Sequence, residues 1–503
     1  MRPRRPRARA LSLAVALVAT AGLAVTGVSA SAAPGHQDHH GPSAPRQVEA
    51  WTSGAKGQSG ATTDRLTAAP VSAGAPADGT TVRVDPQVKY QTMTGFGASV
   101  TDSSAQVLYG IPKDQRDTVM KNLFDPETGD GTSFLRQPIG ASDFVKGADY
   151  SLDDMPAGQK DYGLKHFSVA HDQKQILPLL RQAEKLNPGL KIVGTPWSPP
   201  GWMKTGDSMI DGKLIDSPAI YRAYADYLVK FVKAYAANGV TVDYLTVQNE
   251  PQALNRNNYP GSDMSFEQET KVIDALGPAL KKAGLDTKIL GYDHNWSEHP
   301  NDIKAHEAVG EDPEVNYPYD LLASSAAKWI DGTAYHCYAG DASAMTALRA
   351  SFPGKDIYET ECEGGTITTG LDSVNNWAKT VTYWNIALDE NHNPHQGGCG
   401  TCNGTVTVNS TTGVVTYNAQ YYALGHLSRF VKPGAVHVGA SAARSDATDS
   451  PVQTSAFVNP DGSTAVVAHN TSGTASEPVT VVSGGRGFTA TLAAGATATY
   501  SWR

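Results

Sequence analysis

The sequence predicts an α/β fold, a (β/α)8 TIM barrel with an associated β-sandwich domain. Between about residue 88 and residue 430, eight short apolar runs alternate with amphipathic helical segments, the pattern of a parallel barrel. After residue 430 the chain changes to short alternating runs rich in Thr, Val and Ala, which are typical of a sandwich. A doubly wound sheet is the rival fold, but no Gly-x-Gly-x-x-Gly motif follows the first run.

The N-terminus has the features of a signal peptide. Five Arg residues precede an apolar run at 11–25, and an Ala-x-Ala cleavage motif ends at Ala32. The apolar run is shorter than the roughly 18–20 residues that a membrane-spanning helix needs. We therefore expect removal of residues 1–32, a disordered Pro-, Gly- and His-rich lead at 33–46, and a secreted (extracellular) product without integral membrane contact.

The barrel is expected to span residues 86–430. Its strand-like runs occupy residues 90–98, 133–140, 191–198, 243–250, 288–296, 332–339, 356–361 and 380–388. Helix candidates separate them, and the clearest spans 218–237, where Tyr221, Tyr224, Leu228 and Phe231 repeat with helical spacing before Gly239. Segments 267–282 and 320–329 show the same pattern.

Residues 431–503 are expected to form the β-sandwich. A Pro-Gly turn begins this region, and alternating runs follow at 452–458, 463–469, 478–482, 487–492 and 496–502. Because no long linker separates it from the barrel, the sandwich should pack on the barrel. Within the N-terminal segment 47–85, residues 48–53 have the pattern of a short strand.

The composition excludes several classes of protein. Four Cys in 503 residues cannot carry a disulfide scaffold, and 40% hydrophobic residues argue against a wholly disordered chain. The formal net charge is −9, and removal of residues 1–32 would leave 36 basic residues against 50 acidic ones. Such an acidic protein is unsuited to a polyphosphate, so no nucleic-acid partner is expected.

Two predicted strands end in carboxylates that can face each other across the barrel. The fourth ends at Gln248-Asn249-Glu250 and the seventh at Thr360-Glu361. Glycoside hydrolysis needs two such groups, a neutral acid that protonates the leaving oxygen and an anion at the anomeric carbon. A single Glu at a strand end is more often an ion pair or a solvated charge, but an opposed pair favours catalysis.

Three glutamates compete for the position on the seventh strand. Glu359, Glu361 and Glu363 would share one face of a strand, so alternation does not choose among them. Glu361 is favoured because it lies at the expected end of the strand, just before a Gly-Gly break.

Other residues near the strand ends suit a sugar pocket. Arg136 ends the segment Phe134-Leu135-Arg136 within the second run, and an Arg inside a barrel is expected to pair with an active-site carboxylate. Asp102 follows the first run and can bind sugar hydroxyls or cap the next helix, while Asp143 can serve either substrate or structure. Aromatic faces stack on pyranose rings, and aromatic residues gather at these ends, although each taken singly is more often part of the core. They include Trp197, His336, Tyr338 and Trp384.

Taken together, these motifs resemble glycoside hydrolase family 30, whose members include glucosylceramidases and β-1,6-glucanases. The resemblance covers about residues 47–503 and includes the motifs at 95–102, 135–144, 195–204, 248–251, 336–338 and 384–388. It implies that Glu250 is the acid/base and that Glu361, which follows Thr360, is the nucleophile. It also implies that segment 48–53 contributes a strand to the sandwich and that no metal or other cofactor takes part. The substrate pocket it implies contains Asp102, Arg136, Trp197, Asn249, His336, Tyr338 and Trp384.

The four cysteines fall into two pairs. Cys399 and Cys402 lie in a loop at 391–403 that is longer than the one in glucosylceramidases, and in an exported protein they can form a small disulfide, with metal binding or free thiols as the alternatives. Cys337 and Cys362 lie at adjacent strand ends and are expected to be buried thiols rather than a bridge.

The sequence thus predicts a secreted retaining β-glycoside hydrolase acting on β-D-glucosidic bonds in a β-linked glycan or glycolipid substrate. The enzyme would be of the glucosylceramidase or β-1,6-glucanase type. The alternatives are a β-xylanase or β-galactanase of the same family and a non-catalytic carbohydrate-binding protein. A retaining enzyme requires the two carboxyl groups to lie about 5–5.5 Å apart.

Overall fold

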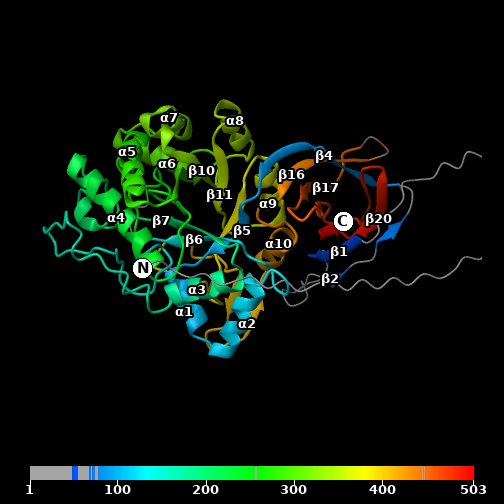
Figure 1. The fold of residues 1–503 in the computed structure, drawn as a ribbon, viewed down its shortest axis with the longest axis horizontal. Coiled ribbons are helices and arrows are strands. Elements are labelled where there is room, and N and C mark those ends of the chain that lie inside the picture. The colour runs from blue at the N-terminus through cyan, green and yellow to red at the C-terminus, as the bar shows by residue number, and fades with distance from the viewer. Residues whose placement is uncertain are drawn as a thin grey trace, which may run out of the picture. The chain divides into compact units, whose positions relative to one another are not determined.

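The structure, a computed structural model, describes residues 48–54, 67–68, 71–73, 78–254, 258–444, 446 and 448–503. The signal peptide and lead predicted at 1–46 lie outside the described residues. The described chain forms an eight-stranded parallel sheet and a separate ten-stranded sheet (Figure 1). None of the helices formed by these residues is both long and apolar enough to cross a bilayer.

Eight parallel strands make the barrel and follow one another around it in chain order. They are β5 (Gly95–Ser99), β6 (Phe134–Pro138), β7 (Lys191–Thr195), β8 (Tyr244–Leu245), β9 (Lys288–Asn295), β10 (Ile330–His336), β11 (Asp356–Glu361) and β12 (Thr380–Asn385). Bridges between Ile357 and Ala378 and between Cys362 and Tyr383 connect the β11 side of the sheet to the β12 side. The predicted barrel is therefore confirmed.

Helices alternate with the barrel strands along the chain (Figure 1). They are α1 (Asp102–Tyr109), α2 (Lys113–Phe124), α3 (Ile176–Leu186), α4 (Pro218–Ala237), α5 (Phe266–Ala283), α6 (Pro300–Val309), α7 (Tyr317–Ala323), α8 (Ser343–Ser351), α9 (Ile367–Asn375) and α10 (Ala419–Ser428). Two short 3-10 helices lie at Gly201–Met203 and Ser325–Lys328, so the helix predicted at 320–329 is divided.

Helix α4 has the bounds that the sequence predicts, because its signals are local. The side chain of Ser217 caps its N-terminus by accepting the N–H of Ile220, and Pro218 occupies the first turn. Its apolar stripe, which includes Tyr224 and Phe231, is fully buried.

Two of the predicted runs are divided between different sheets. The first part of run 90–98 completes β4 (Thr80–Thr92), which belongs to the ten-stranded sheet, and only the rest forms β5. The chain changes partners here, because the N–H of Met93 bonds to the carbonyl of Ala435 and the N–H of Thr94 to that of Lys379. Run 380–388 divides into β12 and β13 (Ala387–Asp389), and β13 forms a small sheet with β14 (Val406–Val408) and β15 (Val415–Tyr417).

The ten-stranded sheet forms the β-sandwich. Its strands, besides β4, are β1 (Val48–Ser53), β2 (Thr67–Ala68), β3 (Ser72–Ala73), β16 (Val436–Arg444), β17 (Val452–Val458), β18 (Thr464–Asn470), β19 (Glu477–Ser483), β20 (Arg486–Leu492) and β21 (Thr497–Trp502). Side chains from distant strands of the sheet, including Ala50, Val82, Phe488 and Tyr500, share one core, so the sheet folds over itself. Strand β1 pairs with β21, which confirms the strand expected at 48–53.

The sandwich packs directly on the barrel, as the missing linker predicts. The buried ring of His426 on α10 bonds to the hydroxyls of Ser53 at 2.8 Å and Thr499 at 2.9 Å, on strands β1 and β21. Gln91 of β4 donates to the carbonyl of Val374 at the end of α9.

Candidate active site

Glu250 and Glu361 meet at the carboxyl ends of the barrel strands. Glu250 follows β8, Glu361 ends β11, and one carboxylate oxygen of each lies within 4.8 Å of the other. Both line a cavity of about 370 Å³. Its other lining residues are Asp143, Trp197, Asn249, Tyr259, Tyr338, Glu363, Trp384, Gly398, Cys399 and Cys402.

A β-bulge in β11 turns Glu361 into the barrel. Successive residues of β10 pair with Glu359 and then with Glu361, so Thr360 is skipped and the register shifts. Thr360 points inward, where its hydroxyl donates to Asp293 at 2.7 Å. Glu359 lies fully buried, and burial raises its pKa well above its ordinary value. The bulge thus distinguishes two glutamates that a regular strand would place on one face.

Arg136, fully buried in β6, connects the groups of the site. Its Nη1 forms an ion pair with Glu361, which is the pairing predicted for it. Its Nη2 donates to Oδ1 of Asn249 at 2.7 Å and to Oδ2 of Asp293 at 2.9 Å. Its guanidinium lies 4.7 Å from the centroid of the Trp197 ring.

The two glutamates have different neighbours. The hydroxyl of Tyr338 donates to Oε1 of Glu361 at 2.7 Å, whereas Nδ1 of His336 lies 3.0 Å from Oε1 of Glu250. Burial raises the pKa of Glu361, with a further contribution from the charge of Glu250, although Arg136 opposes both. Burial also acts to raise the pKa of Glu250, but the hydrogen bond and charge of His336 outweigh it and lower that pKa.

His336 and Asp293 form a buried charge pair beneath the carboxylates. Burial acts to lower the pKa of His336, but the charge of Glu361 and the hydrogen bonds to Asp293 and Glu250 raise it to about 10. Burial acts to raise the pKa of Asp293, and the charges of Arg136 and His336 outweigh it and hold that pKa well below its ordinary value. The sequence motifs did not single out Asp293. A carboxylate inside the apolar run 288–296 is the feature that could have identified it as a site residue.

Two tryptophans form an aromatic wall. The rings of Trp197 and Trp384 stack with centroids 4.8 Å apart, and both residues are buried. Tyr338 is 38% exposed and lies at the open side of the cavity. The structure therefore brings these three predicted residues, with Asn249, into the cavity wall, while Arg136 and His336 lie fully buried against Glu361 and Glu250.

Asp102, like Arg136 and His336, is a predicted substrate-binding residue that is not among the residues lining the cavity. It opens α1, after the N-cap Thr101, and its carboxylate is held by His171 and by Gln106, each at 2.6 Å. In the structure these contacts anchor α1, and contact of Asp102 with sugar hydroxyls stays a prediction. The Asp102 carboxylate binds groups beside α1 because this helix begins directly after β5.

Asp143 lines the cavity, whereas Asp102 does not. It is buried, it lines the cavity, and among the described residues its Oδ1 has no hydrogen-bond partner. Burial raises its pKa well above the ordinary value, and the charges of Glu361 and Glu250 add to this effect. Its position after β6 was the signal that favoured a substrate role.

The loop at 391–403 closes one side of the cavity. Cys399 and Cys402 form the predicted disulfide, so their thiols are not free to bind metal. Gly398 has a φ of +63°, and a Cβ there would come 2.4 Å from Oδ2 of Asp143. The loop therefore packs against Asp143 at a point where only glycine fits.

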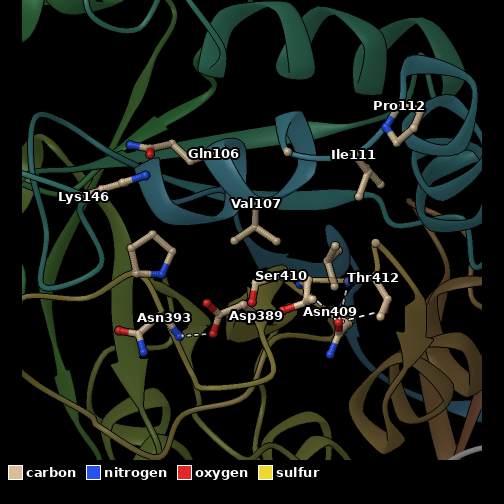
Figure 2. A pocket seen from close by; sticks show the side chains of 15 residues that line it. Gln106, Val107, Ile111, Pro112, Lys146, Asp389, Asn393, Asn409, Ser410 and Thr412 are labelled. Carbon is tan, nitrogen blue, oxygen red and sulfur yellow. Dashed lines mark hydrogen bonds between the residues drawn. The ribbon is translucent and has the colours of Figure 1, made fainter.

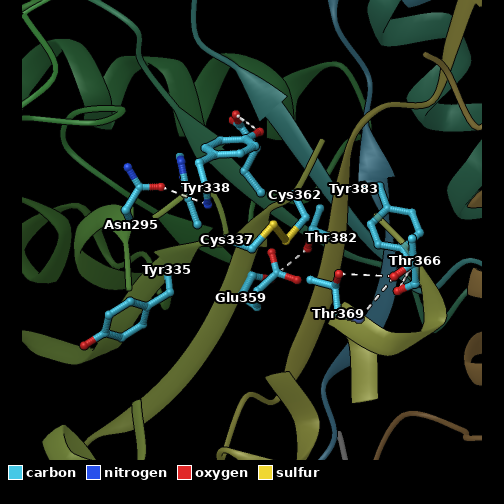
Figure 3. Close-up of a disulfide and its surroundings, with 12 residues drawn as sticks. Asn295, Tyr335, Cys337, Tyr338, Glu359, Cys362, Thr366, Thr369, Thr382 and Tyr383 are labelled. Atoms are coloured by element: carbon cyan, nitrogen blue, oxygen red, sulfur yellow. Dashed lines mark hydrogen bonds between the residues drawn. A yellow bond between two sulfur atoms is a disulfide. The ribbon is translucent and has the colours of Figure 1, made fainter. Parts of the chain in front are cut away.

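The expectation that Cys337 and Cys362 are thiols is wrong, because the structure joins them in a disulfide (Figure 3). Cys337 follows His336 at the end of β10 and Cys362 follows Glu361 at the end of β11. These neighbouring strands bring the two Cα atoms to 5.3 Å, within the range that a disulfide spans. The bridge links the two strand ends that carry catalytic-site residues.

A second cavity, of about 530 Å³, lies between α1 and the segment 389–413 (Figure 2). Asp389 is the single carboxylate among the residues that line it, and Lys146 is the single cation. Glycoside hydrolysis needs a carboxylate pair, which the residues lining this cavity do not offer and those lining the cavity of about 370 Å³ do. A cation at Glu250, His336 and Glu361, which have metal-binding donors, would compete with Arg136 and the charged His336.

Comparison with known proteins agrees with this geometry. The model of the glycosyl hydrolase family 30 TIM-barrel domain matches residues 93–370, and that of the glycosyl hydrolase family 30 beta sandwich domain matches residues 434–500. An endo-1,6-beta-D-glucanase of Neurospora crassa is 35% identical over 412 residues, which cover 78% of this chain and 81% of that protein. The lysosomal acid glucosylceramidase of Mus musculus is 28% identical over 460 residues, 84% of each chain.

Solved structures show the same relationship. The structure of the endo-beta1,6-glucanase BT3312 matches with a TM-score of 0.77 at 31% identity, covering 90% of this chain and 99% of that one. The family expected from the motifs is thus confirmed. The chain belongs to glycoside hydrolase family 30 and is a β-glycoside hydrolase with a TIM barrel and a β-sandwich.

Proposed function

We propose that this hydrolase is secreted and cleaves β-1,6-linked glucan with retention, using Glu361 as nucleophile and Glu250 as acid/base. The separation of their carboxylates, within 4.8 Å, is the observation that carries the proposal. Retaining enzymes hold the two groups about 5–5.5 Å apart, whereas inverting enzymes need about 6.5–9.5 Å to admit a water molecule.

In the first step, Glu361 attacks the anomeric carbon as the glycosidic bond breaks. Arg136 and Tyr338 each bind one oxygen of Glu361, so the carboxylate is oriented before substrate arrives. Glu250 gives its proton to the leaving oxygen, and a covalent glycosyl-enzyme forms.

In the second step, water replaces the leaving group. Glu250, now an anion, takes a proton from the water as its oxygen attacks the anomeric carbon. The bond to Glu361 breaks, the sugar leaves with its original configuration, and Glu250 is again protonated.

The cavity wall supports recognition of a neutral sugar. Trp197 and Trp384 offer aromatic surface, and Asn249 and Asp143 offer polar groups to hydroxyls. A protonated Asp143, which its raised pKa favours, can both donate and accept hydrogen bonds.

The choice of β-1,6-glucan rests on the relatives. The endo-1,6-beta-D-glucanase of Neurospora crassa is 35% identical, against 28% for the mouse glucosylceramidase, over similar shares of the chain. Secretion rests on the signal-peptide features of residues 1–32, and a polymer outside the cell requires an exported enzyme.

A product profile tests the proposal. The mature protein would be incubated with pustulan (a β-1,6-glucan), glucosylceramide, xylan and β-1,4-galactan, with Glu361→Gln as the inactive control. We expect fastest release from pustulan and, by proton NMR, a first product in the β configuration. Faster release from another polymer would overturn the substrate, and an α first product would overturn the retaining mechanism.

A further inference from the structure

We infer that Asp293 is a positioning residue for hydrolysis, acting on both catalytic glutamates without touching substrate. Through His336 it keeps a transferable proton beside Glu250. Through Arg136 it aligns the cation that orients Glu361. This inference rests on the proposed function and adds the residue that coordinates its two carboxylates.

Asp293 is completely buried in β9, and every polar contact of its carboxylate joins it to another barrel strand or strand end. Its Oδ2 accepts from Arg136 at 2.9 Å and from the hydroxyl of Thr246 at 2.8 Å. Its Oδ1 accepts from the hydroxyl of Thr360 at 2.7 Å and faces Nε2 of His336 at 3.2 Å. Asp293 is absent from the cavity wall, so any effect on the reaction passes through these neighbours.

The two hydrogens on Nη2 of Arg136 determine which ring nitrogen of His336 carries the proton that faces Asp293. Nη2 of Arg136 carries two hydrogens, and the acceptors at 2.7 Å and 2.9 Å, Asn249 and Asp293, take both. The third neighbour of Nη2, Nε2 of His336 at 3.3 Å, receives none. Nε2 therefore carries its own hydrogen and donates it to Asp293.

The other ring nitrogen of His336, Nδ1, faces Glu250. Nδ1 of His336 lies 3.0 Å from Oε1 of Glu250, and one proton is shared along that contact. The N–H bond at Nδ1 breaks as an O–H bond forms on Glu250, and Glu250 passes this one proton to the leaving oxygen and is left as an anion. His336 then becomes neutral but keeps its Nε2–H bond to Asp293, and the proton taken from water in the second step restores the pair.

The backbone provides a second link between Asp293 and Glu250. Both residues have positive φ values, 50° for Asp293 and 44° for Glu250, and the N–H of Glu250 donates to the carbonyl of Asp293 at 3.0 Å. Such conformations cost non-glycine residues about 1–3 kcal/mol each and persist where the surroundings enforce them. Because both residues hold this conformation and share a backbone hydrogen bond, the backbone position of Glu250 depends on that of Asp293.

The pH dependence follows from the charges around this pair. The charged and titratable groups near His336 and Glu250 are Arg136, Asp143, Tyr259, Tyr292, Asp293, His294, Asp302, Tyr338, Glu359 and Glu361. Of these, Asp293 is the carboxylate bonded to both His336 and Arg136. Replacing it by neutral Asn removes a negative charge, so His336 and Glu250 release their shared proton at lower pH.

The test compares Asp293→Asn with wild type on aryl β-glucosides, a poor phenyl and a good 2,4-dinitrophenyl leaving group. We expect kcat/KM for the phenyl glucoside to fall about 10²–10³-fold, with a smaller loss for the dinitrophenyl glucoside, which needs little acid assistance. The basic limb of the pH profile should move to lower pH. An equal loss on both substrates with unmoved limbs, or no loss, would overturn the inference.

Two further variants keep this test decisive. Asp172→Asn removes another buried carboxylate, one bonded to Tyr235 away from the cavity, and should leave both limbs unmoved. If Asp293→Asn does not fold, Thr360→Val is measured instead, because it removes one hydrogen-bond donor from Oδ1 of Asp293. The Asp293 carboxylate then interacts more strongly with His336, so the basic limb of the pH profile should move to higher pH. An unmoved limb would overturn the inference. A wild type that releases product from neither pustulan nor the aryl β-glucosides would instead overturn the proposed function.

Discussion

Replacing Arg136 by Lys keeps the positive charge of the site but removes the planar fork that positions Glu361. The guanidinium makes three polar contacts, to Glu361, Asn249 and Asp293, from two separate nitrogens. A single ammonium lies at one point and cannot hold all three acceptors, so we expect the loss of at least two contacts.

The magnitude follows from those contacts. Hydrogen bonds to charged groups contribute about 1.5–3 kcal/mol each, so losing two removes about 3–6 kcal/mol in total, shared between folding and catalysis. If half of this, about 1.5–3 kcal/mol, affects the transition state, kcat/KM falls by about 10–150-fold for Arg136→Lys, because about 1.4 kcal/mol corresponds to a factor of ten.

The assay measures kcat and KM for an aryl β-glucoside together with the thermal midpoint. Arg444→Lys is the matched control, since Arg444 also pairs with two carboxylates, Asp446 and Glu477, but lies in the sandwich. It should leave kcat/KM unchanged. A folded Arg136→Lys enzyme that keeps more than a tenth of the wild-type kcat/KM would refute the view that the fork orients the nucleophile.

Three further predictions concern the catalytic pair, the domain contact and the loop. Glu361→Gln should lower kcat about 10⁴-fold on every substrate, whereas Glu250→Gln should lower kcat/KM about 10²–10⁴-fold on phenyl glucoside and little on the dinitrophenyl glucoside; the reverse pattern would exchange their roles. Burial lowers the pKa of His426 to about 3, so the unfolded chain takes up this proton near pH 6.5, and stability should fall by up to about 1.4 kcal/mol per pH unit as the pH drops from 6.5 towards 3. Melting curves at pH 7 and 5 should show a smaller difference for His426→Asn, and an unchanged difference would contradict this. Replacing Cys399 and Cys402 together by Ser should raise KM severalfold with little change in the melting temperature, because so short a loop adds little entropy to the unfolded chain; an unchanged KM would contradict a role of the loop in the cavity.

Much of the fold could be predicted because its signals are local. Helical periodicity with a Ser cap and a Pro in the first turn defines α4, and short runs with β-branched and aromatic residues between turns define strands such as β17. Predictions were wrong where hydrogen bonds between distant segments decide. Run 90–98 is one apolar stretch, but at Met93 its backbone changes partner from the sandwich to the barrel.

The residues of the site divide in the same way, into those that local sequence predicts and those that contacts between distant segments decide. Arg136 could be predicted because an Arg in a barrel strand needs a carboxylate, and Trp197 because it follows a strand end. Asp102 and Asp143 look equivalent along the chain, yet only Asp143 lines the cavity, because His171, which lies far along the chain, engages Asp102.

By itself, then, the sequence determined the alternating architecture and the family, and it predicted the pair Glu250 and Glu361, because these depend on residue type and on order along the chain. Only the tertiary structure decided that a bulge turns Glu361 inward and that Asp293 joins both halves of the site. The physical reason is that a bulge and a buried hydrogen-bond network depend on neighbours from other strands, and a residue's own segment carries no record of those partners.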